Sequence, residues 1–166
     1  MRPGEAVTVM SATPVATAEA MRDLGERLAG SLAAGDVVVL DGDLGAGKTT
    51  LTQGLARGLG VGEAVTSPTF VIARVHAAAP GRPALVHVDA YRLGSGVELD
   101  DLDLDADLAD AVVVVEWGRG IAERLADSVL VVRIERGDDE GDEGRTVTAS
   151  GYGPRWCGRG GERGSP

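Results

Sequence analysis

The sequence contains no asparagine, one lysine and one cysteine, and each scarcity limits what the protein can be. Cys157 has no partner for an internal disulfide, and one cysteine with two histidines cannot complete a structural zinc site. No apolar run approaches the roughly 20 residues that a membrane-spanning helix needs. The N-terminal segment lacks a basic stretch leading into a long apolar run, which is the pattern of a secretory signal. We therefore expect a cytoplasmic protein.

Positive charge is also scarce, with 16 Lys and Arg against 26 Asp and Glu, a net charge of −10. Such a surface repels phosphate backbones, so direct contact with tRNA or other nucleic acids is disfavoured. A single small phosphate site remains possible, because local backbone dipoles then outweigh the net charge. Every basic side chain other than Lys48 is arginine, which indicates that this position requires a compact ammonium group.

Hydrophobic periodicity predicts an α/β layered domain over residues 1–150. Thr17 is expected to cap a helix over 18–34, which ends at Gly35. Val37–Leu40 is predicted to be a strand buried on both faces. A second helix is predicted after it and runs to about Leu59. Further strands are predicted at 69–76, 84–89, 112–115, 129–134 and 146–149, and short helices within 98–110 and 121–126. Two predicted hairpins make the sheet mixed, and residues 151–166, rich in Gly and Arg, are expected to form a flexible tail.

A phosphate-binding motif lies between the first predicted strand and the second helix. Residues 42–49, GDLGAGKT, fit the P-loop pattern G-x-x-x-x-G-K-[ST] at every fixed position. Lys48 is expected to reach the β- and γ-phosphates, and the Thr49 hydroxyl to ligate Mg²⁺. Guanine-specific GTPases use an Asn/Thr-Lys-x-Asp segment, which this chain cannot contain, so ATP is the favoured nucleotide.

Two carboxylates follow apolar strands and are candidates for the metal and for orienting water. Asp89 follows residues 85–88, and Glu116 follows residues 112–115. Acids just past such strands belong at the ligand-binding end of an α/β sheet. His87 is interpreted as a core histidine and Trp117 as a packing residue. Whether Asp89 or Glu116 orients the attacking water is left open.

A hydroxyl-rich turn, TSPTF at 66–70, has two possible interpretations. Ser67 and Thr69 would sense the γ-phosphate if the turn is a switch segment. The same residues suit an ordinary turn that leads into a strand. Arg92 is either a phosphate or partner contact or a surface arginine, and no arginine finger is assigned.

The ordered series GDLGAGKTT (42–50), SPTF (67–70), HVDAYRL (87–93) and VVEWG (114–118) resembles the TsaE family. The resemblance spans about residues 18–132 and implies a three-layer P-loop NTPase fold with a mixed sheet. By position, it implies that residues 45–50 hold the phosphates, a set made up of Gly45, Ala46, Gly47, Lys48, Thr49 and Thr50. It also implies that Thr49 and Glu116 bind Mg²⁺ and that Asp89 takes a Walker-B-like role. One departure is Met21, where the family usually has Thr or Ser.

The resemblance further implies the function. Members of the family are ATPases that work with TsaD and TsaB, the subunits that transfer a threonylcarbamoyl group to adenosine 37 of tRNA. ATP turnover is expected to gate or reset that transferase, and hydrolysis by this chain alone to be weak. Two other functions remain open: a P-loop kinase acting on a small molecule, and a nucleotide-dependent binding module without useful hydrolysis. The tail arginines Arg155, Arg159 and Arg163 are interpreted as part of a disordered segment rather than as an RNA contact.

Overall fold

A computed structural model gives the fold, and it describes residues 6–43, 45, 47–62, 65, 73–89, 110–116, 126–137 and 144–157. Seven strands form one sheet in the order β1-β7-β6-β2-β5-β4-β3. The strands are β1 (Val7–Val15), β2 (Val37–Gly42), β3 (Ala73–His76), β4 (Ala84–Asp89), β5 (Ala111–Glu116), β6 (Val129–Arg136) and β7 (Arg145–Tyr152). The helices are α1 (Ala18–Ala29), α2 (Lys48–Leu59) and the short α4 (Pro154–Cys157).

The middle of the sheet is parallel and its edges are antiparallel. β6, β2, β5 and β4 run in one direction, whereas β7 and β3 run against their neighbours. Both predicted hairpins are present as the pairs β3–β4 and β6–β7. The predicted α/β fold with a mixed sheet is therefore confirmed.

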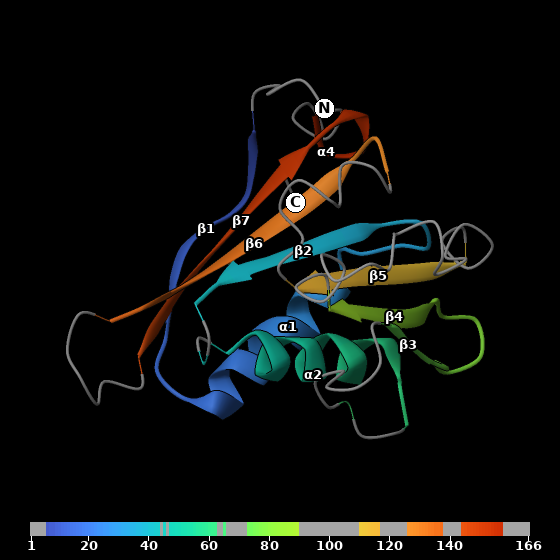
Figure 1. The fold of residues 1–166 in the computed structure, drawn as a ribbon, viewed down its shortest axis with the longest axis horizontal. Helices are drawn as coiled ribbons and strands as arrows, with labels where there is room; N and C mark the ends of the chain where they lie inside the picture. Colours follow the sequence, from blue (N-terminus) through green and yellow to red (C-terminus); the bar gives the residue numbers. More distant parts are fainter. Residues whose placement is uncertain are drawn as a thin grey trace, which may run out of the picture.

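Both faces of the central strands are buried, as their unbroken valine runs predict. One apolar cluster lies between the sheet and the helices α1 and α2, which lie side by side on the same face (Figure 1). The alternate residues, including Val39, Val88 and Val113, form a second buried cluster on the opposite face. Apolar burial on both faces is what a three-layer arrangement requires.

Helix α1 begins where the sequence predicts and ends sooner. The Thr17 side chain accepts a hydrogen bond from the Ala20 N–H at 3.1 Å, which satisfies one unpaired donor of the first turn. The helix ends at Ala29 rather than near residue 34, because the Gly30 N–H turns back to the carbonyls of Arg27 and Leu28. The predicted end was five residues too late.

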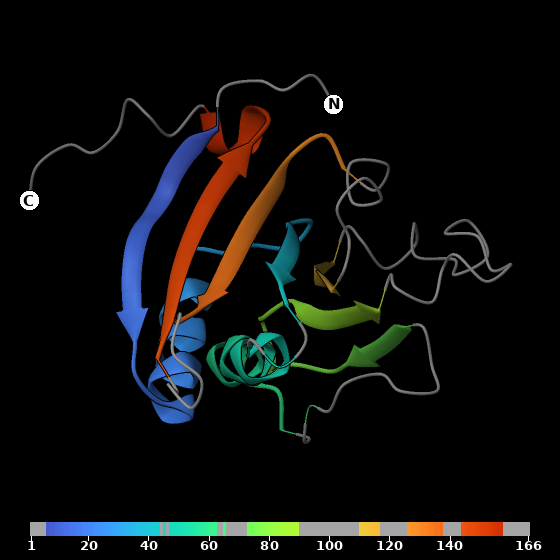
Figure 2. The same ribbon diagram turned by 60° about the vertical axis from the view of Figure 1, so that its left-hand side comes forward.

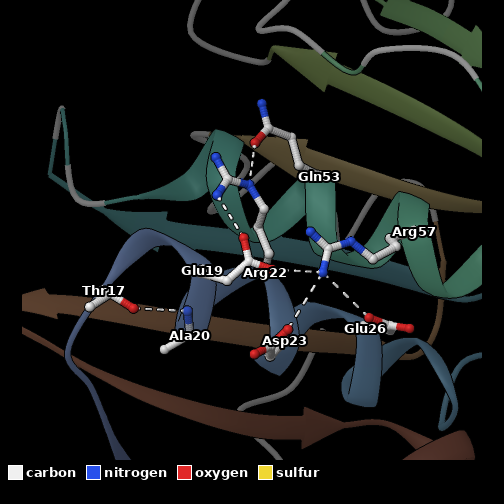
Figure 3. A network of polar contacts seen from close by, with 8 residues as sticks. All are labelled: Thr17, Glu19, Ala20, Arg22, Asp23, Glu26, Gln53 and Arg57. Atoms are coloured by element: carbon white, nitrogen blue, oxygen red, sulfur yellow. Dashed lines mark hydrogen bonds and ion pairs between the residues drawn. The ribbon is translucent and has the colours of Figure 1, made fainter.

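A charged rim joins α1 to α2 on the solvent side (Figure 3). The Nη1 of Arg57 on α2 lies 3.1 Å from Glu19, 3.5 Å from Asp23 and 3.6 Å from Glu26, all on α1. The hydrogen bond and charge of Arg57 lower the pKa of Glu19. Any stability from this pair is fully present above pH 4.5, the ordinary pKa of the carboxyl, and fades as pH falls through the lowered pKa. Because these groups are exposed, the rim contributes little energy and mainly fixes orientation.

Strand β1 was not predicted, and it pairs antiparallel with β7 (Figure 2). Pro14 lies inside this strand, and proline is tolerated only where no ladder hydrogen bond is needed. β1 is an edge strand, and its register shifts twice along β7. Half-exposed, irregular edge strands leave a weak pattern in sequence, which explains the omission.

The prediction that the flexible tail begins at residue 151 is wrong for residues 151–157. Gly151 and Tyr152 complete β7, and Pro154–Cys157 form α4. Trp156 is 2% exposed and packs into the cluster beneath α1 and α2. A Cβ built on Gly151 would lie 2.3 Å from the Cβ of Trp156, so this glycine makes room for the indole. Residues 158–166, with Arg159 and Arg163, lie outside the described residues.

Arg155 holds this C-terminal turn against the start of β2. Its Nε and Nη2 donate to the two carboxylate oxygens of Asp36 at 2.9 and 3.0 Å, and Nη2 also donates to the Ser31 carbonyl at 3.2 Å. The guanidinium lies 4.6 Å from the centroid of the Trp156 ring. The guanidinium of Arg155 is paired and largely buried, so its role is structural. A contact between Arg155 and RNA would require a guanidinium that is exposed and unpaired.

Arg155→Ala is expected to lower the free energy of unfolding by about 2 kcal/mol, because it leaves the buried Asp36 carboxylate without its cation. Arg133 is a matched control, since its pair with Glu135 at 3.1 Å joins two exposed side chains. Arg133→Ala should cost less than about 0.5 kcal/mol. Urea unfolding of both variants measures the difference, and equal losses would refute the structural role.

Several sequence predictions fall outside the described residues, namely residues 69–72, the helix within 98–110 and most of the helix over 121–126. Within the part of the chain that is described, no helix is long and apolar enough to cross a membrane.

Candidate functional site

The P-loop connects the end of β2 to the start of α2, as the motif requires. Gly45 and Gly47 have φ of 78° and 114°, conformations that side-chain-bearing residues rarely adopt. Gly47 is the N-cap residue of α2, and as a glycine it has no side chain that could cap the first turn. The first helical N–H groups have no partner within the helix, so they are donors available to an anion.

Lys48 is buried, at 7% exposure, beneath this loop. Its Nζ donates to the carbonyls of Gly42 at 2.6 Å and Asp43 at 3.1 Å. Burial lowers the pKa of Lys48, and this effect outweighs the opposing attraction of Glu116 and nearby aspartates. The ammonium is thus incompletely compensated, which favours an added anion as its partner.

The sheet register brings both candidate carboxylates to the P-loop. Glu116 at the end of β5 is level with Leu40 of β2 on one side and with Asp89 of β4 on the other. The Thr49 hydroxyl, in the first turn of α2, donates to the Glu116 Oε1 at 3.4 Å across 67 residues. Strand ends far apart in sequence therefore meet at one place, as the strand-end argument predicts.

The carboxylates around Lys48 limit which ligands the site can bind. Four carboxylates act on the Lys48 ammonium, those of Glu116, Asp43, Asp41 and Asp89. A triphosphate placed here would face more negative than positive side-chain charge. Binding of such an anion therefore calls for a divalent cation, which would neutralise both.

The donor set fits Mg²⁺. Its ligands would be hard oxygens, the Thr49 hydroxyl and the Glu116 carboxylate, whose 3.4 Å separation is close to the roughly 3 Å between adjacent ligands of an octahedral Mg²⁺. Among the described residues, no group of three His, Cys, Asp or Glu side chains could hold a metal alone.

A half-open cavity of about 240 Å³ adjoins the P-loop where α1 begins. It is lined by Thr17, Ala18, Met21, Gly45, Gly47, Thr50 and Arg145. Its volume is below the roughly 300–1,000 Å³ of pockets that enclose a whole drug-sized ligand, so it suits one part of a nucleotide. Met21 lines the cavity and packs against the P-loop, since a Cβ on Gly47 would lie 3.3 Å from the Met21 Cε.

Arg145 is a site residue that sequence reasoning missed. Its Nη2 donates to the Gly45 carbonyl at 3.4 Å across 100 residues. Arg136 faces Arg145 in the β6–β7 register, and its Nη1 would lie 3.9 Å from a Cβ on Gly45. The β6–β7 hairpin thus brings two arginines to the lip of the P-loop. Arginine at a hairpin end carries no motif, so only the fold reveals this.

Several predicted site residues lie outside the described residues, namely Ala46, Ser67, Thr69, Arg92 and Trp117. One contact leads toward the possible switch turn. Gln53 on α2 donates to the Val65 carbonyl at 3.1 Å and accepts from the Arg22 Nε at 3.1 Å. The residue just before the turn is therefore anchored to both helices.

Comparison with known proteins gives the family. The model of "Threonylcarbamoyl adenosine biosynthesis protein TsaE" matches residues 15–147. The chain belongs to the TsaE family. A TsaE protein of Streptomyces coelicolor is 61% identical over 139 residues, covering 82% of this chain and 94% of the relative. A TsaE protein of Bacillus subtilis is 44% identical over 124 residues, covering 74% and 73%.

A solved structure agrees with this assignment. The crystal structure of Bacillus subtilis YdiB superposes with a TM-score of 0.72 at 32% identity, covering 92% of this chain and 91% of that one. The seven-stranded mixed sheet of this TsaE protein is therefore a P-loop NTPase fold. The family is one of threonylcarbamoyladenosine biosynthesis proteins, which is consistent with the resemblance of the four sequence motifs.

Proposed function

We propose that this TsaE protein is a Mg²⁺-dependent ATPase whose turnover gates or resets the TsaD/TsaB threonylcarbamoyl-transferase acting on adenosine 37 of tRNA. The observation that carries the proposal is the meeting of Lys48, Thr49 and Glu116 at the mouth of a P-loop. The family supplies the pathway. The ATPase chemistry is inferred from the site.

Each group in the site has a defined task in this proposal. Main-chain N–H groups at the start of α2 hold the phosphate oxygens, and Lys48 leaves the carbonyls of Gly42 and Asp43 to bind the β- and γ-phosphates. Thr49 and Glu116 hold Mg²⁺, which supplies neutralisation of charge on the phosphate oxygens. Asp89, level with Glu116 in the register, would orient the attacking water.

The remainder of the nucleotide is assigned to the cavity beside the loop. Gly45 and Thr50 of the predicted phosphate loop line it together with Met21. Arg145 offers a planar cation that suits either a phosphate oxygen or the face of a base. We assign ATP to the site because the guanine-specific segment is absent from the sequence.

We infer that hydrolysis by the protein alone is slow and that a partner accelerates it. In P-loop enzymes an arginine supplied by a partner can raise turnover by roughly 10³-fold or more. Here the two described arginines near the loop lie by Gly45, and we infer that TsaD or TsaB completes the site.

Phosphate release tests the proposal, measured with the protein alone and with TsaD and TsaB, each with and without Mg²⁺. We expect slow Mg²⁺-dependent release alone and a rise of at least about tenfold with the partners. The control is a variant without the P-loop lysine, in which TsaD and TsaB should not increase phosphate release. No partner effect would contradict the gating role.

The same assay separates the two alternatives. A small-molecule kinase would place the γ-phosphate on an added metabolite rather than release it. A binding module would bind ATP and release no phosphate under any condition. Either result would replace ATP hydrolysis as the activity.

A further inference from the structure

We propose that His87 is a positioning residue that orients the Glu116 carboxylate toward the bound metal. The proposal rests on the Mg²⁺-dependent nucleotide site proposed above and adds to it a residue from the interior of the sheet. His87 lies on β4, and its imidazole Nε2 is 3.5 Å from the Glu116 Oε1.

The burial of His87 is unusual for its chemistry. The side chain is 0% exposed, within a strand whose other buried members are Leu85, Val86 and Val88. Among the described residues, neither ring nitrogen has a hydrogen-bond partner. A buried polar group without a hydrogen-bond partner destabilises the folded state relative to a satisfied one. A leucine or valine would serve packing alone better, so the imidazole has another role.

The sheet register explains why His87 faces Glu116. His87 pairs with Val114, two residues before Glu116 on β5, so the two polar side chains are diagonal neighbours on one face. That face is the one that α1 and α2 cover, since Leu85 and Val114 belong to the cluster beneath the helices. Glu116 is 4% exposed there. A buried carboxylate needs donors to stay charged and fixed.

Two side chains lie next to one oxygen of Glu116. The Oε1 accepts from the Thr49 hydroxyl at 3.4 Å and is approached by His87 from the sheet side. When Thr49 turns to the metal, it no longer holds Glu116, and His87 is left as the fixed donor. A small rotation of either side chain closes 3.5 Å to hydrogen-bond length. Partners of metal-binding carboxylates typically govern affinity or activity by about 10–100-fold.

The test measures the dissociation constant of ADP with and without Mg²⁺. The readout is the ratio of the constant without Mg²⁺ to the constant with Mg²⁺. His87→Leu should lower this ratio about tenfold, because the metal site loosens while the phosphate loop is unchanged. His87→Gln keeps an N–H donor and should restore the ratio to within about threefold of the wild type. The ratio cancels any loss of folded protein, so a destabilised variant still gives an answer.

His76 provides a matched control. It is also 0% exposed and pairs with Leu85 from the neighbouring strand β3. His76→Leu removes an equally buried imidazole and should leave the ratio unchanged. An unchanged ratio in His87→Leu, or an equal fall in His76→Leu, would overturn the proposal. A wild-type ratio of one would instead refute the Mg²⁺ site itself.

A metal-free measurement decides the matter if His87→Leu does not fold. The chain has only two histidines, so imidazole ¹⁵N spectra give two pairs of ring-nitrogen signals, and His76→Leu shows which pair belongs to His87. Glu116→Gln should shift the Nε2 signal of His87 and leave that of His76 in place. No shift at His87 would show that it does not hold Glu116.

Discussion

Lys48→Met is expected to lower Mg²⁺-dependent ATP hydrolysis by at least about 10²-fold while leaving the fold as stable as the wild type or more stable. Removing one preorganised donor to a developing charge typically costs about 10²–10³ in turnover. The stability of the variant follows from the lowered pKa of Lys48, which shows that burial of the ammonium outweighs the attraction of its neighbours. Methionine fills the same space without that cost.

The sign of the pH dependence is fixed by this shift. Between the lowered pKa of the folded state and the ordinary value of 10.5, the unfolded chain binds more protons at this lysine than the folded chain does. The wild type therefore gains stability at Lys48 as pH rises through that window, and Lys48→Met does not. Any excess stability of the variant in urea unfolding at pH 7 should shrink toward pH 10.

Lys48→Arg is the control that separates charge from shape. It keeps the positive charge but replaces a compact ammonium with a planar fork, which does not fit the 2.6 Å contact with the Gly42 carbonyl. We expect it to lose hydrolysis as well, by more than about tenfold. Wild-type hydrolysis in Lys48→Met would refute the assignment of the phosphate site.

Gly54→Ala is expected to lower the free energy of unfolding by about 2 kcal/mol or more, although alanine favours a helix by about 1 kcal/mol. A Cβ at Gly54 would lie 2.2 Å from the Arg22 carbonyl oxygen of α1, which is main chain and cannot move aside without shifting the helix. A Cβ on Gly25 would likewise lie 2.5 Å from the Leu51 carbonyl oxygen. Overpacking of this kind costs about 1–3 kcal/mol, and more where the backbone must move.

Displacing α1 should also weaken nucleotide binding, because Met21 of α1 packs on Gly47 of the P-loop. Gly62→Ala is the matched control, since a Cβ there has nothing within 4 Å, and it should change stability by less than about 0.5 kcal/mol. Thermal unfolding should place Gly54→Ala roughly 4–8 °C below the control. If Gly54→Ala and Gly62→Ala unfold at the same temperature, α1 and α2 do not pack through their glycines.

The glycines of α2 show where sequence reasoning stops. Taken alone, Gly54 and Gly58 weaken a helix, and the structure shows that they permit close contact with α1. A Cβ on Gly58 would lie 2.6 Å from the Ala29 Cβ. Propensity is a property of a segment, whereas this benefit belongs to a pair of helices.

The C-terminal segment shows the same limit in another form. Its Gly and Arg content predicts looseness, yet Trp156 fills a space left by Gly151 and Arg155 pairs with Asp36. Asp36, the partner of Arg155, lies on a distant part of the chain, and Gly151 lies across a turn from Trp156. Composition does not report such contacts, so the predicted end of the domain was too early.

Reading the residues in order was enough to predict the phosphate loop, its solitary lysine, the buried strands and the two strand-end acids, because each depends on residues that are contiguous in the chain. The folded chain was needed to show that Glu116 meets Thr49, that His87 lies behind Glu116 and that Arg145 reaches Gly45. These contacts depend on strand order and register, which are set by the packing of the whole sheet. Local chemistry is encoded in a few adjacent residues, but the assembly of a site from distant strands is not.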